Sequence, residues 1–170
     1  MYYSAIKMFD IANGPGCRVT LFVSGCRRQC PGCHNPETWD FHAGQVFTNQ
    51  TALEIIDALE DENIQGLTIM GGEPLEPENK KGTRAIVQVV KSVCPEKDVW
   101  LYTGYTYGTL KLSGDPVIKD IFELIDVLVD GEYREDERDI SLRFRGSQNQ
   151  RIIDMARTRE AEKVVLWEGV

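Results

Sequence analysis

Residues 18–33 read RVTLFVSGCRRQCPGC and carry the two features that decide the fold. The first part, RVTLFVS, is β-branched, aromatic and mostly apolar, which predicts a buried strand. A cysteine cluster begins where this strand ends, at Gly25 and Cys26. The NGPG sequence at residues 13–16, just before the strand, is typical of a turn. We therefore expect a buried strand whose carboxyl end carries a cysteine-rich loop.

Outward from this stretch, apolar strands alternate with amphipathic helices. Further strands are expected at residues 64–70, 99–103, 127–129 and 164–167, and helices at residues 51–60, 83–93 and 117–124. Leu53 and Val93 are assigned to the buried faces of the first two helices. This alternation implies right-handed βαβ units and a largely parallel sheet. Because the strands are too few for a closed eight-stranded barrel, we predict an α/β fold, a partial (βα) barrel or curved, largely parallel sheet with helices on the outer face.

Composition and charge narrow the class of protein. The 170 residues are 42% hydrophobic and 27% charged, which suits one globular domain spanning residues 1–170. The net charge of −8 argues against nucleic acid as a partner, because sequence-independent binding depends on Lys and Arg neutralising phosphates. No apolar run approaches the ~20 residues of a membrane span, and the N-terminus lacks a signal-peptide pattern. We expect no membrane partner and a cytoplasmic location.

The cysteine cluster predicts a metal centre. Cys26, Cys30 and Cys33 have the spacing C-x3-C-x2-C. Thiolates are the usual ligands of iron–sulfur clusters, which normally take four of them. With three, one iron of a four-iron cluster would have no protein ligand and could bind a substrate, as an open position does in a catalytic metal centre. The alternative is a non-catalytic binding module with structural zinc on the three cysteines and His34, although adjacent Cys33 and His34 would have difficulty reaching one tetrahedral ion.

Other candidate site residues follow the later strands. Gly71, Gly72 and Glu73 come after the strand at residues 64–70, and Thr103 and Asp130 end the next two strands. Active sites in α/β proteins assemble at this edge of the sheet. Glycines lack a Cβ and let the backbone approach a ligand closely or adopt positive φ. Glu73 either contacts a ligand or orders the loop, and plain turns are the alternative at both glycine-containing loops.

Together, these segments resemble the radical S-adenosylmethionine superfamily. The resemblance rests on two features, the cysteine spacing after an apolar strand and the GGEP sequence at residues 71–74. Within the superfamily, the chain resembles the activating proteins of anaerobic ribonucleoside-triphosphate reductase in NGPG (13–16), LFVSGC (21–26), CPGCHN (30–35), WLYTGY (100–105), VLVDG (127–131) and RGSQNQR (145–151). The short chain fits these proteins better than the larger pyruvate formate-lyase activase.

The resemblance implies an enzyme with two cofactors. A [4Fe–4S] cluster on Cys26, Cys30 and Cys33 would bind S-adenosylmethionine at its open iron and receive an electron from reduced flavodoxin or a similar donor. Cleavage would yield methionine and a 5′-deoxyadenosyl radical, which would take a hydrogen from a glycine of the reductase, the protein substrate. Two alternatives remain, namely that the chain activates another glycyl-radical enzyme, such as pyruvate formate-lyase, or that it acts on a small molecule. So short a chain favours a protein substrate.

The same resemblance assigns cofactor contacts. It places Gly32, Cys33 and His34 near the adenine, although Gly32 stands where many superfamily members have an aromatic residue. It places Gly71, Gly72 and Glu73 near the methionine portion, and Thr103 and Asp130 within reach of the cofactor. Arg27 and Arg28, inside the cysteine loop, are either solvated charges or cations that attract an acidic electron donor.

Overall fold

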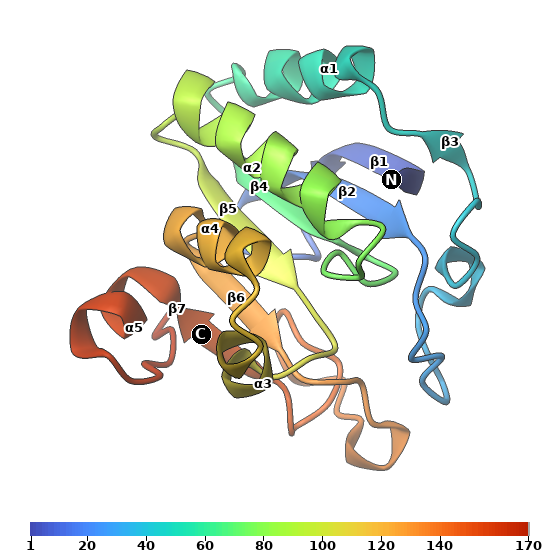
Figure 1. The fold of residues 1–170 in the computed structure, drawn as a ribbon, viewed down its shortest axis with the longest axis vertical. Coiled ribbons are helices and arrows are strands. Elements are labelled where there is room, and N and C mark those ends of the chain that lie inside the picture. Colours follow the sequence, from blue (N-terminus) through green and yellow to red (C-terminus); the bar gives the residue numbers. More distant parts are fainter. Residues whose placement is uncertain (170) are drawn as a thin grey trace.

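A computed structural model describes residues 1–169, and its strands form one seven-stranded open sheet (Figure 1). In spatial order the strands are β3 (Gln45–Val46), β1 (Tyr2–Asp10), β2 (Cys17–Ser24), β4 (Ile64–Gly71), β5 (Asp98–Tyr102), β6 (Val127–Asp130) and β7 (Arg151–Asp154). The central strands β2, β4, β5 and β6 are parallel, and β3, β1 and β7 extend the edges antiparallel. The predicted α/β fold with an open, parallel-centred sheet is confirmed.

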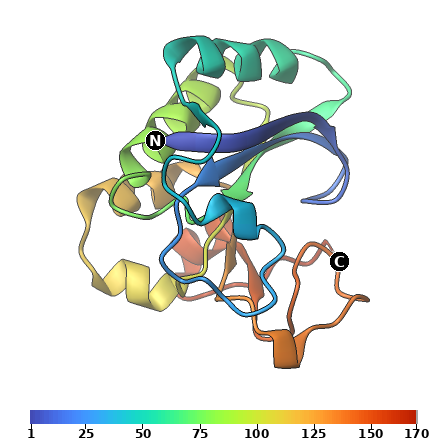
Figure 2. The same cartoon turned by 90° about the vertical axis from the view of Figure 1, so that its right-hand side faces the viewer.

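The helices cover one side of this sheet. They are α1 (Asn49–Leu59), α2 (Lys80–Val93), α3 (Tyr107–Leu112), α4 (Pro116–Leu124) and α5 (Met155–Ala161). Figure 2, turned by 90°, shows α1, α2 and α4 on one face, while the loop after β2 and the segment at residues 131–150 lie beside the sheet's lower end. None of the helices within residues 1–169 is long and apolar enough to cross a membrane.

Two helix positions and one strand differ from the sequence predictions. Leu53 and Val93 are 54% and 55% exposed, so their assignment to buried faces was wrong. The helical period instead buries Ile55, Ile56 and Leu59 in α1, and Cys94 takes the inward position that follows Val90 at the end of α2. Residues 164–167 run beside β7 but form only an isolated bridge at Leu166, so the last strand is β7.

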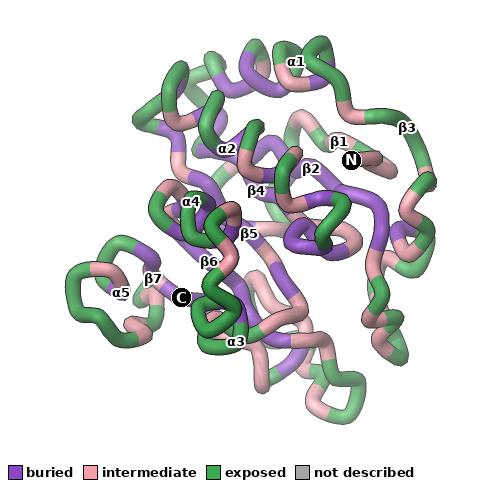
Figure 3. Tube along the Cα trace, viewed as in Figure 1, coloured by how far each residue is buried: buried purple, intermediate pink, exposed green. Residues whose placement is uncertain are grey.

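Alternating side chains divide the sheet into two faces. Val19, Leu21 and Val23 of β2 point toward the helices and join the main hydrophobic core. On the opposite face, Trp100 packs with Val129 and neighbouring side chains against Phe144 and Trp167. Figure 3 shows buried backbone running along the central strands, with exposed positions on the outer helical surfaces and in the loops. The second face is therefore covered by loops rather than by helices.

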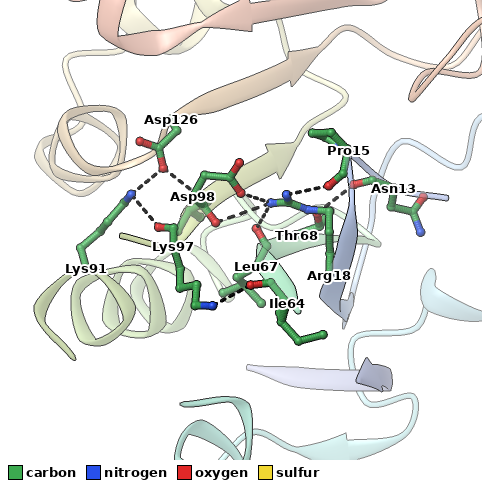
Figure 4. A network of polar contacts seen from close by, with 11 residues as sticks. Asn13, Pro15, Arg18, Ile64, Leu67, Thr68, Lys91, Lys97, Asp98 and Asp126 are labelled. Carbon is green, nitrogen blue, oxygen red and sulfur yellow. Dashed lines mark hydrogen bonds and ion pairs between the residues drawn. The ribbon is translucent and has the colours of Figure 1, made fainter. Parts of the chain in front are cut away.

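A buried polar network lies near the amino ends of the parallel strands (Figure 4). Arg18 is fully buried, and its Nε donates to Thr68 Oγ1 at 2.8 Å while Nη2 donates to the Asp98 carboxylate at 2.5 Å. The same guanidinium group lies 5.5 Å from the centre of the Trp100 ring, and Thr68 donates onward to the Asn13 carbonyl oxygen. We call Asn13, Arg18, Thr68 and Asp98 the Arg18 network. It fastens β2, β4 and β5 to one another beneath the loops at their other ends.

Candidate functional site

A cavity of about 310 Å³ lies at the carboxyl ends of β2, β4 and β5. Most of the predicted site residues line it, namely Cys26, Cys30, Cys33, His34, Gly71, Gly72, Glu73 and Thr103. The fold thus brings together residues as far apart in the sequence as Cys26 and Thr103, because the ends of neighbouring parallel strands meet at one edge. Gly32 and Asp130 are the predicted residues that do not line this cavity.

The cysteine loop is held by backbone hydrogen bonds. The N–H groups of Gly25 and Cys26 donate to the carbonyl oxygens of Thr38 and Trp39 at 2.7 and 3.1 Å. Inside the loop, the Cys33 N–H donates to the Cys30 carbonyl oxygen at 3.1 Å. Cys26, Cys30 and Cys33 are free and partly buried. The three residues therefore line the cavity from a defined loop rather than pack in the core.

The surroundings of the Cys26 and Cys30 thiols favour the protonated form. Burial raises the pKa of the Cys26 thiol, although the N–H groups of Arg28 and Gln29 oppose this shift. Burial also raises the pKa of the Cys30 thiol, with the charges of Cys33 and Glu132 acting in the same direction and Arg28 against them. Cysteine binds metals as the thiolate, so metal binding at this loop would release protons.

The donor set fits an iron–sulfur cluster. Three thiols in one cavity are the soft ligands that such clusters use. In residues 1–169, no three His, Cys, Asp or Glu side chains lie close enough together to hold a single metal ion. A four-iron cluster takes each thiolate on a separate iron and does not need the sulfur atoms to converge. The Nε of Arg28, in the same loop, is buried without a hydrogen-bond partner, which fits a bound group beside it.

The two glycines at the carboxyl end of β4 serve the contact between β4 and β2. Gly71 has a φ of +108°, and a Cβ there would lie 2.7 Å from the Val23 carbonyl oxygen. A Cβ on Gly72 would lie 2.7 Å from the Gly25 carbonyl oxygen. The N–H of Gly72 donates to Val23 and that of Glu73 to Gly25. Because these N–H groups are used, the loop would meet a ligand through carbonyl oxygens, which are suited to an ammonium group.

Glu73 ties this loop to the end of β5. Its carboxylate is 1% exposed and accepts hydrogen bonds from the Thr103 hydroxyl at 2.9 Å, the Gly104 N–H at 2.8 Å and the Leu75 N–H at 3.0 Å. Burial raises the pKa of Glu73 to about 7, and these hydrogen bonds only partly counter it. Of the two roles considered for Glu73, these contacts favour ordering of the loop.

Asp130 has structural partners instead of a place in the cavity. Its buried carboxylate accepts from Arg151 Nε at 2.9 Å and from the Tyr107 N–H at 2.7 Å. Gly32 has a φ of +68° and lies against Glu135, outside the cavity wall. The predicted cofactor contacts of Asp130 and Gly32 therefore stay predictions that the cavity does not support.

Arg145, Gly146 and Gln150, from the late segment at residues 145–151, also line the cavity. The Gln150 side chain accepts from the Gly146 N–H at 2.8 Å and donates to the Gly131 carbonyl oxygen at 3.0 Å. Arg145 Nη1 donates to the Gln150 carbonyl oxygen at 2.6 Å. His34 and Tyr133 also line the cavity, and their ring centres lie 4.8 Å apart. The hydrogen bonds therefore order the late segment, and the ring contact joins the end of the cysteine loop to the residues that follow β6.

Comparison with known proteins identifies the family. Residues 12–153 match the model of a 4Fe-4S single cluster domain. The anaerobic ribonucleoside-triphosphate reductase-activating protein of Escherichia coli (strain K12) is 45% identical over 152 residues, which cover 88% of this chain and 96% of the relative. Proteins of the same name from Pasteurella multocida (strain Pm70) and Enterobacteria phage T4 are 47% and 43% identical, covering 88% and 89% of this chain and 95% and 93% of theirs.

The chain belongs to this family of activating proteins. The resemblance of the short motifs is thereby confirmed over most of the chain. The family model specifies an iron–sulfur cluster, which supports the cluster over the zinc alternative.

Both arginines of the cysteine loop are engaged in this activating protein. Arg27 pairs with the buried Glu76 at 2.7 Å and with Glu78 at 2.5 Å. Arg28 pairs with Glu132 at 3.2 Å. These ion pairs offset part of each charge, but the Arg27 side chain is 55% exposed, so both interpretations, a solvated charge and a cation that attracts an acidic electron donor, stay predictions.

Several cavity residues of this activating protein escaped the sequence analysis. They are Ala12, Met70, Tyr102 and Phe144, among others. Met70 and Tyr102 stand directly before predicted site residues, on strands whose alternation was visible, so they could have been found. Ala12 and Phe144 lie in loops, and no local sequence pattern predicts that these loops contact the cavity.

Proposed function

We propose that this chain activates anaerobic ribonucleoside-triphosphate reductase by generating a glycyl radical on it. The observation that carries the proposal is that three free cysteines and the Gly71–Gly72 loop line one cavity in a member of the activating-protein family. When bound, the cluster would supply the electron that cleaves S-adenosylmethionine into methionine and a 5′-deoxyadenosyl radical. This radical would then take a hydrogen atom from a glycine of the reductase.

The residues of the chain would bind and orient the two cofactors and enclose them in the cavity. Cys26, Cys30 and Cys33 would hold the cluster as thiolates. The carbonyl oxygens of Gly71 and Gly72 would accept hydrogen bonds from the methionine ammonium, while Glu73 keeps their loop against β5. His34, packed against Tyr133, would face the adenine, and Thr103 would line the methionine side. Gly32 and Asp130 would act through the loops that they shape.

The open sheet supports a protein as the substrate. The cavity is lined by loops at one edge of an open sheet, and a partner polypeptide would supply the missing wall. We further propose reduced flavodoxin or a similar protein as donor, a cytoplasmic location, and one domain over residues 1–170. No role for nucleic acid or membrane is proposed.

The test uses anaerobically purified protein reconstituted with iron and sulfide. After reduction and addition of S-adenosylmethionine, we expect 5′-deoxyadenosine from the native chain and background amounts from Cys30→Ala. Cys17→Ala is the matched control, because Cys17 is also free and partly buried but lies outside the cavity. Undiminished product from Cys30→Ala would disprove the cluster assignment.

A second measurement separates the two candidate partners. With purified anaerobic reductase present, we expect the electron paramagnetic resonance signal of a glycyl radical on that protein. Product without this signal, together with a signal on pyruvate formate-lyase, would assign the chain to another glycyl-radical enzyme.

A further inference from the structure

Arg28 follows an unusual path along the cavity wall. Its side chain leaves the cysteine loop and crosses to the end of β5, where the guanidinium carbon lies 4.2 Å from the centre of the Tyr105 ring. A Cβ on Gly104 would lie 2.4 Å from Arg28 Cδ, so the absence of a side chain at residue 104 makes this path possible. The guanidinium group is thus positioned by packing, before any ligand is present.

The hydrogen-bonding capacity of this guanidinium is only partly used. Nη1 meets the Glu132 carboxylate at 3.2 Å, which is long for a charge-assisted hydrogen bond. Glu132 is 45% exposed, and its other carboxylate oxygen lies 3.8 Å from Arg134. Nε is buried and has no hydrogen-bond partner. A buried donor without an acceptor is uncommon in proteins and calls for a missing partner.

The other arginines nearby are less available. Arg145 also lines the cavity, but its Nη1 donates to a backbone carbonyl oxygen at 2.6 Å and holds the late segment in place. Arg27 is directed to Glu76 and Glu78. Arg28 therefore stands out as the cation that combines a place in the cavity wall with an unpaired donor.

We propose that Arg28 binds the carboxylate of the methionine portion of S-adenosylmethionine, and that Glu132 occupies the guanidinium group until this ligand replaces it. The inference rests on the proposed function. Arginine pairs with carboxylates through two parallel N–H···O bonds, a geometry that an ammonium group cannot reproduce. The displaced Glu132 side chain would remain beside Arg134 and in contact with solvent, so its release costs little.

The test compares two variants that break the same ion pair from opposite sides. Dissociation constants for S-adenosylmethionine are measured by anaerobic equilibrium dialysis on cluster-reconstituted protein. We expect Arg28→Gln to raise the constant at least tenfold, and Glu132→Gln to lower it severalfold because it removes the competing carboxylate. Arg28→Lys should give an intermediate loss. If the pair were merely structural, both Gln variants would weaken binding.

A second ligand identifies the group that Arg28 recognises. Decarboxylated S-adenosylmethionine lacks the proposed partner, so the native chain and Arg28→Gln should bind it equally. Native affinity of Arg28→Gln for S-adenosylmethionine, or the same loss for both ligands, would overturn the inference. If the native chain itself bound no S-adenosylmethionine, the proposed function would fail as well, which distinguishes the two failures. Iron content and unfolding midpoints of each variant verify that the loop is intact.

Discussion

The two ends of the parallel strands differ in how fully their polar side chains are hydrogen-bonded. Near the amino ends, Arg18 is buried and directs its donors at Thr68, Asp98 and backbone oxygens. At the carboxyl ends, three cysteines are free and Arg28 keeps an unpaired Nε. A saturated network has little capacity for a ligand, whereas unpaired groups cost stability until a ligand completes them. One end therefore stabilises the sheet, and the other is available for chemistry.

The largest effect on stability is expected from disrupting the Arg18 network at the amino ends of the strands. Arg18→Met would remove the donor of the Leu67 carbonyl oxygen and of Asp98. Loss of one partner of a fully buried ion pair costs about 3–5 kcal/mol, and because the Asp98 side chain is 28% exposed we expect the lower end of this range. Urea unfolding of the metal-free protein measures this loss. Arg84→Met is the control, because the Arg84–Asp120 pair is partly exposed and should contribute less than about 1 kcal/mol. Equal effects of the two variants would refute the contrast between the ends.

A smaller, pH-dependent effect is expected at Glu73, where the carboxyl ends bury a carboxylate. Its pKa rises from 4.5 to about 7 on folding, so between these values the folded state holds a proton that the unfolded state has released. Stability should therefore fall as the pH rises through this window, by up to about 3 kcal/mol. Glu73→Gln cannot titrate and should lose this part of the decline. Unfolding free energies at pH 5 and pH 8 test this, and parallel profiles would contradict it.

The smallest effect is expected at Asp10, which adjoins the Arg18 network. Burial acts to raise the pKa of Asp10, but hydrogen bonds from Thr20, Asn13 and the Ala12 N–H together lower it below 3.8. Stability from this group is therefore present above pH 3.8 and lost as the pH falls through the folded-state pKa. Asp10→Asn should cost about 1–2 kcal/mol at pH 7 and less near pH 2.5. A cost that does not shrink in acid would show that the carboxylate charge is not the cause.

Prediction from sequence succeeded where the signal is local. The strand at residues 18–24, the cysteine spacing and the glycine loop are contiguous segments, and each carries its own periodicity or residue type. It failed for Leu53 and Val93 because a shift of one position on a helix exchanges buried and exposed faces. It also missed β1 and β7, which extend the parallel centre of the sheet by antiparallel pairing with the strands next to them in sequence, β2 and β6.

By itself, then, the sequence determined the cysteine spacing, the alternation of the central strands with helices, and the loops in which chemistry is expected. Tertiary structure alone decided which partners those residues meet. Arg28 and Glu132 are 104 positions apart, and Arg18 and Asp98 are 80 apart. Thr103 reaches Glu73 only because β4 and β5 are neighbours in the sheet. The kind of ligand that a residue can bind follows from the chemistry of its own side chain, which the sequence gives directly. Whether its polar atoms are already hydrogen-bonded depends on segments that are distant in the sequence and that only folding brings into contact.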